Sequence, residues 1–280
     1  MIGLDRAYMV SVARMALDED LGSGDITSLL TIPENSVSKA RIISKAEGVI
    51  AGVDLAAAVF SEVDPSVSFR KTVADGDKVA VGSVVAEISG STRSILAGER
   101  VALNYMQRMS GTATMANKYV ELVSGTNARI VDTRKTTPGL RRLEKYAVCM
   151  GGASNHRFGL SDGILIKDNH IAASGGVGKA VKAAKAGAPH TLKVEVEVSN
   201  LDQLKEALEA GADAALLDNM DLETMRKSVD FIAGRIVLEA SGNINESTVA
   251  QVAETGVDII SSGALTHSVM ALDLSLKIIE

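Results

Sequence analysis

Apolar and polar residues follow two different patterns along this chain, and the pattern changes near residue 112. Beyond that point, short apolar runs alternate with segments that carry apolar residues at helical spacing. The apolar runs predict strands at 128–132, 163–167, 192–198, 214–218, 235–239 and 257–261. Consecutive strands start roughly 20 to 35 residues apart, which favours βα units and a parallel sheet.

The first 111 residues predict a separate α+β domain. Residues 4–20 carry apolar positions at helical spacing, which predicts a helix. Short β-like runs follow at 40–44, 48–52, 67–73 and 82–89, with turn-rich segments between them. We therefore expect an antiparallel sheet here, and we place the domain boundaries at 1–111 and 112–266.

Composition limits the classes of protein to which the chain can belong. It has 280 residues, a formal net charge of -6, 3% aromatic residues and no tryptophan, which argues against a general surface for nucleic acid or anionic membrane. Its single cysteine, Cys149, excludes an internal disulfide framework and fits a reducing compartment. No apolar run approaches the roughly 18 residues of a membrane span, and the N-terminus does not resemble a signal peptide. We expect a cytoplasmic protein, in which Cys149 is a core residue.

Positive charge is concentrated in residues 132–171, although the chain as a whole is acidic. Seven arginines and lysines face four carboxylates there, a local charge of +3. Arg141, Arg142, Glu144 and Lys145 have the spacing of one exposed helix face. Other cations stand at strand ends or beside glycines, where a small polyanion would bind: Arg134, Lys135, Arg157 and Lys167.

Polar residues end each predicted strand of the second domain. They are Asp132, Lys167, Glu197, Asp218, Glu239 and Ser261. The carboxyl ends of parallel strands converge on the active site in βα barrels, so we expect these side chains to lie together. The alternative is a ring of structural ion pairs, because buried charges need partners.

Two glycine-containing loops follow the last two predicted strands, where barrel folds often hold phosphate. The first loop is Ser241-Gly242-Asn243 and the second is Ser262-Gly263-Ala264. Glu197 and Asp218, on adjacent strands, could hold Mg2+ together with water and phosphate oxygens. No cysteine and histidine constellation suggests zinc.

The four histidines of the chain differ in their surroundings. His156 follows a glycine turn and precedes Arg157, so we interpret it as a donor of hydrogen bonds to substrate. His170 is expected to hold its own loop, and His190, beside Pro189, is expected to be structural.

Several strings of residues occur in an order that resembles quinolinate phosphoribosyltransferase, also called nicotinate-nucleotide pyrophosphorylase (carboxylating). They are EDLGSGDITS, AGERVALNYMQRMSGTAT, DTRKTTPGLR, GGASNHRFGLSDGILIKDNH, VEVEV, LLDN, EASGNI and SSGALTHS. The resemblance covers nearly the whole chain. It implies an incomplete α/β barrel of six or seven strands with a separate N-terminal α+β domain. We expect the last segment, 267–280, to form a helix that packs on that domain.

The resemblance also implies a reaction, in which quinolinate and 5-phosphoribosyl-1-pyrophosphate (PRPP) give nicotinate mononucleotide, pyrophosphate and CO2. It implies a catalytic set of Lys135, Glu197 and Asp218, with Mg2+ as cofactor held by Glu197 and Asp218. The resemblance implies that Arg100, Arg134, Lys135, His156, Arg157 and Lys167 bind substrate. The pattern of strand ends and loops adds Glu197, Asp218, Ser241, Gly242, Asn243, Ser262, Gly263 and Ala264 to the predicted substrate-binding residues. The family supplies the arginine matched by Arg100 from the neighbouring subunit, so a homodimer or hexamer is expected.

The chain departs from the family pattern close to this site. The glycine-rich run before Asn155 contains Ala153 and Ser154, and Cys149 stands where a basic residue is common. These departures bear on the geometry of the loop and not on the class of reaction. Three alternatives stay open: a paralogue with another aromatic acceptor, a nicotinate phosphoribosyltransferase that does not decarboxylate, and a non-catalytic sugar-phosphate binder. The set of cations disfavours the first two, and the pair Glu197 and Asp218 disfavours the third.

Overall fold

The computed structural model describes residues 3–279, and these form two compact units. Unit 1 comprises Met1–Asn117, Arg142–Gly152 and Val269–Glu280, and unit 2 comprises Lys118–Arg141 and Ala153–Ser268. The segment Arg142–Gly152, which the sequence assigned to the barrel, therefore belongs to unit 1. No helix among residues 3–279 combines the length and apolar character needed to cross a membrane.

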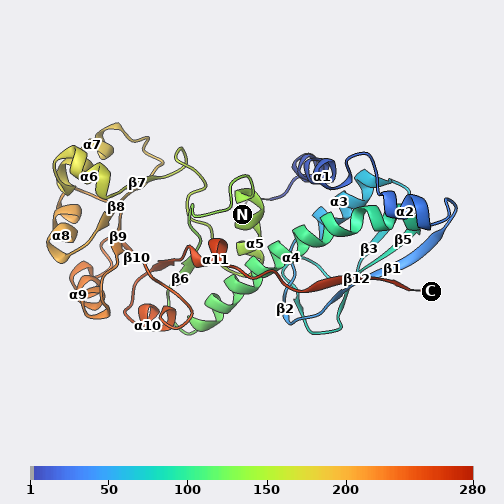
Figure 1. Ribbon diagram of the computed structural model, residues 1–280. Helices are drawn as coiled ribbons and strands as arrows, with labels where there is room; N and C mark the ends of the chain where they lie inside the picture. Colours follow the sequence, from blue (N-terminus) through green and yellow to red (C-terminus); the bar gives the residue numbers. More distant parts are fainter. Residues whose placement is uncertain (1–2, 280) are drawn as a thin grey trace. The chain divides into compact units, whose positions relative to one another are not determined.

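Unit 2 is built on a six-stranded sheet in which every paired strand is parallel to its neighbour (Figure 1). In spatial order the strands are β6 (Arg129–Val131), β11 (Ile259–Ser261), β10 (Val237–Ser241), β9 (Ala214–Asp218), β8 (Val194–Val198) and β7 (Ile164–Ile166). All six lie where the apolar runs predicted strands. Within residues 3–279 the sheet does not close between β6 and β7, so the predicted incomplete barrel is confirmed.

Helices follow the strands of unit 2 along the chain. They are α6 (Asp168–Ser174), α7 (Val177–Gly187), α8 (Leu201–Glu209), α9 (Leu222–Ile232), α10 (Val249–Ala253) and α11 (Ala264–His267). Asn200 and Asp221 begin α8 and α9 as N-caps, because their side chains accept hydrogen bonds from the backbone N–H three residues on. The longer helices α7, α8 and α9 then bury one apolar face.

The alternation of residues in strand β8 determines which of its side chains share a face of the sheet. In its VEVEV sequence the valines at 194, 196 and 198 are buried, and the two glutamates alternate with them. Side chains of a strand alternate between its faces, so Glu195 and Glu197 share the other face. Asp218 stands opposite Ser241 in the pairing of β9 with β10. The ends of the central strands therefore align along one edge of the sheet.

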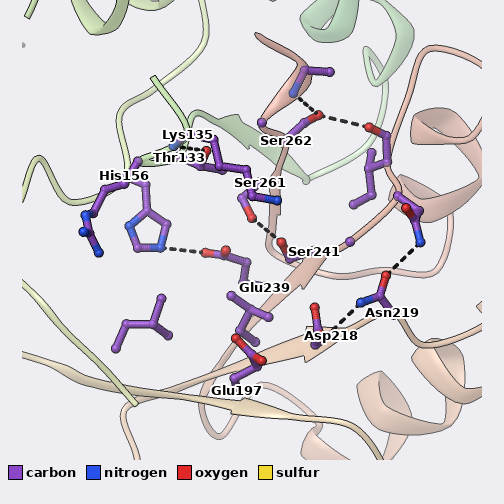
Figure 2. A pocket seen from close by; sticks show the side chains of 18 of the residues that line it. Thr133, Lys135, His156, Glu197, Asp218, Asn219, Glu239, Ser241, Ser261 and Ser262 are labelled. Carbon is purple, nitrogen blue, oxygen red and sulfur yellow. Dashed lines mark hydrogen bonds and ion pairs between the residues drawn. The ribbon is translucent and has the colours of Figure 1, made fainter. Parts of the chain in front are cut away.

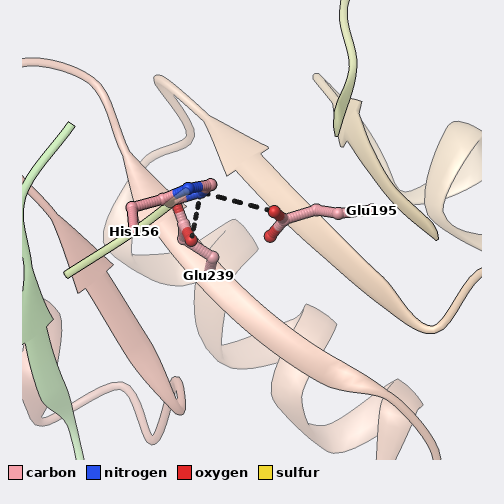
Figure 3. Close-up of side chains that lie close together, drawn as sticks. All are labelled: His156, Glu195 and Glu239. Atoms are coloured by element: carbon pink, nitrogen blue, oxygen red, sulfur yellow. Dashed lines mark ion pairs between the residues drawn. The ribbon is translucent and has the colours of Figure 1, made fainter. Parts of the chain in front are cut away.

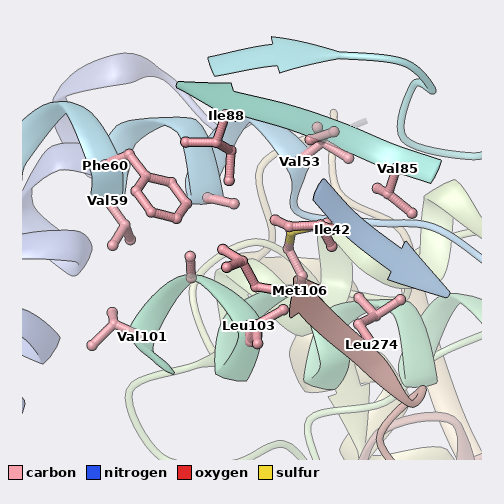
Figure 4. Close-up of a cluster of buried hydrophobic side chains, with 14 of the residues drawn as sticks. Ile42, Val53, Val59, Phe60, Val85, Ile88, Val101, Leu103, Met106 and Leu274 are labelled. Carbon is pink, nitrogen blue, oxygen red and sulfur yellow. The ribbon is translucent and has the colours of Figure 1, made fainter. Parts of the chain in front are cut away.

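Unit 1 contains a four-stranded antiparallel sheet and several helices. Its strands, in spatial order, are β12 (Leu274–Ile279), β1 (Val37–Ser44), β5 (Val84–Ser91) and β3 (Ser68–Lys71), with a separate pair of β2 (Gly48–Val49) and β4 (Lys78–Val79). Its helices are α1 (Arg6–Leu21), α2 (Ile26–Thr31), α3 (Val53–Val63) and most of α4 (Thr92–Leu122) and α5 (Arg141–Met150). Figure 4 shows its core, in which Phe60, Ile42 and Met106 are fully buried.

The expected C-terminal helix at 267–280 is wrong. Apart from residue 280, which lies outside the described residues, this segment ends in strand β12, which pairs with β1 along six positions. Leu274 and Leu276 alternate with more exposed residues, and this alternation suits a strand with one buried face. The segment does pack on unit 1, where it completes the sheet beside β1.

The predicted exposed helix face on α5 is also wrong. Glu144 is 1% exposed and Lys145 is fully buried. The Arg108 guanidinium, on α4, donates to Glu144 Oε1 at 2.8 Å. Glu144 thus pairs with a residue of the helix α4. It does not lie on an exposed helix face, as its i,i+3 and i,i+4 spacing had predicted.

Candidate active site

A cavity of about 760 Å3 lies at the carboxyl ends of the strands of unit 2 (Figure 2). All of the predicted site residues line it except Arg100, which is exposed on α4 in unit 1. The predicted residues that line it are Arg134, Lys135, His156, Arg157, Lys167, Glu197, Asp218, Ser241, Gly242, Asn243, Ser262, Gly263 and Ala264. Residues far apart in sequence therefore meet because parallel strands end at a common edge.

Two short loops, 241–243 and 262–264, form one part of the cavity wall. Ser241 and Ser261, at the ends of their strands, are joined by a hydrogen bond between their hydroxyls of 3.0 Å. The chain passes so close to its neighbours at Gly263 that a Cβ atom there would lie 2.9 Å from Lys135 Cδ. Thr266 Oγ1 donates to the Lys135 carbonyl at 2.7 Å, so Lys135 is held beside the second loop.

Two carboxylates stand on the adjacent strands β8 and β9. Glu197 Oε2 accepts from Lys167 Nζ at 2.8 Å, and Asp218 Oδ2 accepts from Asn219 Nδ2 at 3.0 Å. Within residues 3–279 the remaining oxygens, Glu197 Oε1 and Asp218 Oδ1, make no hydrogen bond or ion pair with protein. Hard oxygen donors with free lone pairs in a polar cavity suit Mg2+, and the donor chemistry of this pair fits that ion.

Four cations line the same cavity: Arg134, Lys135, Arg157 and Lys167. Arg157 is held by a hydrogen bond from its guanidinium to the Gly163 carbonyl at 2.9 Å. Burial lowers the pKa of Arg157, and the positive charge of Arg134 lowers that pKa further. Two guanidinium groups that repel each other in one cavity would be stabilised by an anion bound between them.

Asp132, at the end of β6, holds the loop that carries His156. Its side chain is fully buried, and Oδ1 accepts from the His156 backbone N–H at 2.9 Å. Its other oxygen, Oδ2, accepts from Asn155 Nδ2 at 2.6 Å. The sequence had placed Asp132 among the strand ends without giving it this role. His170 Nδ1 accepts from the Lys167 backbone N–H at 2.9 Å, so His170 holds its own loop as predicted.

His156 forms a cluster with two glutamates that the predicted site lacked, of which Glu239 is buried and Glu195, like His156, is partly exposed (Figure 3). Its Nε2 lies 3.4 Å from Glu195 Oε2 and 3.4 Å from Glu239 Oε2. Glu195 was recognisable in VEVEV, since it shares a strand face with Glu197. Glu239 had been identified as a strand end, but nothing in the sequence joined either residue to His156.

The cluster retains a proton to higher pH than its separate groups would. Burial lowers the pKa of His156, but its hydrogen bonds and charge interactions with Glu195 and Glu239 outweigh burial and raise it to about 9. Burial also raises the pKa of Glu195, with a smaller contribution from the Glu239 charge. The Arg157 backbone N–H donates to His156 Nδ1 at 2.6 Å, which places the ring proton on Nε2. With Nδ1 as an acceptor the ring carries one proton, on Nε2, so a second proton of the cluster lies on a carboxylate. The raised pKa therefore belongs to the three groups together.

These three side chains also have the spacing of metal ligands, since their ligand atoms lie within 4.8 Å of one another. The hydrogen bond at Nδ1 argues against a metal, because a ring with an unprotonated Nδ1 carries its proton on Nε2. In this structure Nδ1 accepts from the Arg157 backbone N–H, and Nε2 faces Glu195 and Glu239. His156 can therefore donate a hydrogen bond to substrate, as predicted, only if Nε2 exchanges one of its glutamate partners for the substrate.

The sequence reasoning missed several other residues that line the cavity. They are Thr133, Leu165, Leu216, Asn219, Asn245, Ile244 and His267. Asn219 could have been found from its place directly after Asp218 at a strand end. Leu165, Leu216 and Ile244 could not be recognised from the sequence, because an apolar residue in or beside a strand is expected to belong to the hydrophobic core.

Models of known protein families match most of the chain. Residues 25–110 match the N-terminal domain of quinolinate phosphoribosyl transferase, and residues 112–277 match its C-terminal domain. The boundary between the two matches falls next to the change of pattern in the sequence.

Curated proteins and solved structures resemble the chain over nearly its full length. A protein of Bacillus subtilis described as a probable nicotinate-nucleotide pyrophosphorylase [carboxylating] is 46% identical, covering 93% of this chain and 90% of the relative. The quinolinate phosphoribosyltransferase [decarboxylating] 2 of Nicotiana glauca is 44% identical, covering 95% of this chain and 81% of the relative. The structure of the nicotinate-nucleotide pyrophosphorylase from Francisella tularensis superposes with a TM-score of 0.93 at 41% identity, covering 99% of this chain and 98% of the other.

Proposed function

Because the chain belongs to the quinolinate phosphoribosyl transferase family, we propose that its cavity transfers the phosphoribosyl group of PRPP to quinolinate, with loss of CO2. The products are nicotinate mononucleotide, pyrophosphate and CO2, as in the synthesis of NAD. One observation carries this proposal. A single cavity joins a group of four cations to two carboxylates with free oxygens and to two Ser-Gly loops.

The cations suit the acceptor substrate. Quinolinate is a flat dianion with two neighbouring carboxylates, and paired guanidinium groups recognise such anions through planar, charge-assisted hydrogen bonds. Burial lowers the pKa of Arg157 most, and the charge of Arg134 lowers it further, so an anion bound between the two guanidinium groups would relieve their repulsion. Leu165 and Leu216 supply apolar surface on the cavity wall for the aromatic ring.

The carboxylates and loops suit the donor substrate. Glu197 and Asp218 would hold Mg2+, which when bound neutralises charge on the diphosphate of PRPP. The loops 241–243 and 262–264 offer backbone N–H groups and hydroxyls to phosphate oxygens. Lys135, held beside the second loop, lies within the same cavity and would bind the departing pyrophosphate.

The residues act on charges that develop during the reaction. As the bond from ribose C1 to the diphosphate breaks, positive charge grows on the ribosyl group, and Glu197 and Asp218 stabilise it. The pyridine nitrogen then attacks C1 and becomes a pyridinium. The carboxylate next to this nitrogen leaves as CO2, its electron pair stays on the ring carbon beside the positive nitrogen, and a proton replaces it. Arg134 and Arg157 would orient the carboxylates throughout, and the scheme needs no covalent nucleophile.

The direct test is incubation with Mg2+ and PRPP, together with either quinolinate or nicotinate, while CO2 and pyrophosphate are measured. We expect equal amounts of CO2 and pyrophosphate with quinolinate, no turnover after chelation of Mg2+, and poor turnover of nicotinate. A monocarboxylate would leave part of the cationic wall unpaired. Comparable turnover of nicotinate without CO2 would instead identify a phosphoribosyltransferase that does not decarboxylate.

We further propose that the enzyme works in the cytoplasm as a homodimer or hexamer in which Arg100 completes the site of a neighbouring subunit. Arg100 is an exposed cation on α4 and does not line the cavity of its own unit 2. Arg100→Ala and Lys135→Ala should each be nearly inactive. If subunits exchange, a mixture should regain about a quarter of the wild-type sites, because one site of each mixed dimer carries neither lesion. A mixture that stays inactive despite demonstrated exchange would contradict shared sites.

A further inference from the structure

Asn219, directly after β9, adopts a backbone conformation that few residues other than glycine tolerate. Its φ is 52°, in the left-handed region, where asparagine is one of the more tolerated side chains. Its backbone N–H donates to the Ser241 carbonyl at 3.0 Å, which extends the pairing of β9 with β10 by one residue. This conformation places the Asn219 amide between the end of β9 and the loop that follows β10.

Both ends of the Asn219 side chain are used there. Nδ2 donates to Asp218 Oδ2 at 3.0 Å, and Oδ1 accepts from Asn243 Nδ2 at 3.0 Å (Figure 2). The orientation of the amide is fixed by chemistry, since the opposite orientation would set an oxygen against the Asp218 carboxylate and an NH2 group against that of Asn243. A single side chain thus connects a carboxylate of the site with loop 241–243.

Loop 241–243 approaches the Asn219 amide closely. Gly242 has φ 93°, and a Cβ atom there would lie 2.3 Å from Asn219 Oδ1. The next residue, Asn243, also has a left-handed backbone, with φ 51°. Glycine adopts a positive φ without strain, but the left-handed conformation of Asn243 is unfavourable and must be stabilised by surrounding contacts. The hydrogen bond from Asn243 to Asn219 is a contact of this kind.

We propose that Asn219 is a positioning residue, which holds the Asp218 carboxylate and loop 241–243 so that one metal-bound diphosphate contacts both. It satisfies Asp218 Oδ2 and leaves Oδ1 for a cation. It also fixes the loop whose N–H groups face the phosphate. This inference rests on the proposed function, because it takes Asp218 as a metal ligand and loop 241–243 as a phosphate site.

Glycine variants separate the two hydrogen bonds without adding backbone strain, because glycine accepts φ near 50°. Asn219→Gly removes both bonds, and Asn243→Gly removes only the bond between the two asparagines. The probe is magnesium pyrophosphate, whose binding is measured by calorimetry at several Mg2+ concentrations. Quinolinate, titrated separately, reports on the cationic part of the same cavity.

We expect Asn219→Gly to weaken magnesium pyrophosphate binding about tenfold or more and to raise the Mg2+ concentration needed for it. Asn243→Gly should weaken binding about threefold and leave the Mg2+ requirement at the wild-type value. The double variant should bind within about twofold of Asn219→Gly, because Asn243 acts through Asn219. All three variants should bind quinolinate within about twofold of wild type.

Unchanged binding of magnesium pyrophosphate by Asn219→Gly would overturn the proposal, and so would additive losses of binding in the double variant. A parallel loss of quinolinate binding would also overturn it, because it would show that Asn219 has only a structural role. Failure of the proposed function is distinguishable, because the wild-type protein itself would then fail to bind quinolinate or magnesium pyrophosphate.

Discussion

His156 Nε2 lies 3.4 Å from Glu239 Oε2, and the second oxygen of this buried carboxylate, Oε1, has no hydrogen-bond partner within residues 3–279. A buried carboxylate with one unsatisfied oxygen is costly unless a proton or cation is close. Glu195 brings a second carboxylate to the same nitrogen. The Asp132 carboxylate accepts from the His156 backbone N–H, and the Arg157 backbone N–H donates to the ring, so the position of the ring is fixed. The protonation of the cluster of His156, Glu195 and Glu239 is therefore part of the stability of unit 2.

The first prediction concerns stability and pH. The pKa of His156 in the folded protein, about 9, is above its ordinary value of 6.5. The stabilisation is then fully present below pH 6.5 and is lost as pH rises through about 9. We expect this to lower the free energy of unfolding by roughly 2 to 3 kcal/mol across that interval. Urea unfolding of wild type and His156→Gln at a series of pH values measures the difference. His190→Gln, at an exposed histidine, is the control. Identical pH slopes for His156→Gln and wild type would refute this assignment.

The second prediction separates the two substrates. Arg157→Ala should weaken quinolinate binding at least tenfold while PRPP binding changes little, because a charge-assisted hydrogen bond to the acceptor is lost. Asp218→Asn should do the reverse in the presence of Mg2+. Calorimetric titration with each ligand measures both effects. Arg142→Ala is a matched control from the same cation-rich segment, since Arg142 pairs with Asp5 in unit 1. If each variant lost both ligands equally, the assignment of the two halves of the cavity would be wrong.

The third prediction tests the close approach at Gly242. In Gly242→Ala the new Cβ would lie 2.3 Å from Asn219 Oδ1, in addition to the strain of a φ of 93°. Gly211→Ala carries a similar strain, with φ 86°, but its Cβ would meet no atom within 4 Å. Both variants should lose about 1 kcal/mol of stability. Only Gly242→Ala should also lose magnesium pyrophosphate binding, by tenfold or more. Equal binding by both variants would show that the contact with Asn219 does not shape the loop.

The fourth prediction tests the strand at the end of the chain. Leu274 is 3% exposed in β12, whereas Ile278 in the same strand is 47% exposed. We expect Leu274→Ala to lower the free energy of unfolding by about 3 kcal/mol, and Ile278→Ala by less than about 1 kcal/mol. Chemical unfolding monitored by circular dichroism compares the two. Similar losses would mean that the two side chains do not differ in burial.

The sequence predicted unit 2 well for a physical reason. Parallel strands are buried on both faces, so most of them appear as short apolar runs bounded by polar or glycine residues, while β8 appears as an alternation of valine and glutamate. The predicted positions of the strands were enough to predict that Lys167, Glu197, Asp218 and the loop 241–243 meet, because all of them follow the same edge of the sheet. The positions of the predicted residues in one cavity follow from this topology.

Contacts between segments that are distant in sequence could not be predicted in the same way. The pairing of β12 with β1 depends on an open edge in unit 1, and LSLKII alone carries no sign of it. Glu144 is buried where Arg108 of the distant helix α4 pairs with it. Glu195 and Glu239 approach His156 only because their strands converge with the loop that Asp132 holds. Each case requires knowledge of which surfaces meet, and local pattern does not contain it.

The place of β12 in the sheet of unit 1 has a consequence for synthesis. During translation β1 is synthesised early. Its partner β12 is synthesised only after the whole of unit 2, residues Lys118–Arg141 and Ala153–Ser268. During that interval one edge of β1 exposes unpaired backbone groups, and Val37, at the start of β1, is 76% exposed even in the finished fold. Unpaired strand edges invite pairing with other chains. The half of the protein that is translated first is thus the half whose sheet is completed last, and the nascent chain is most prone to aggregate before residues 274–279 emerge.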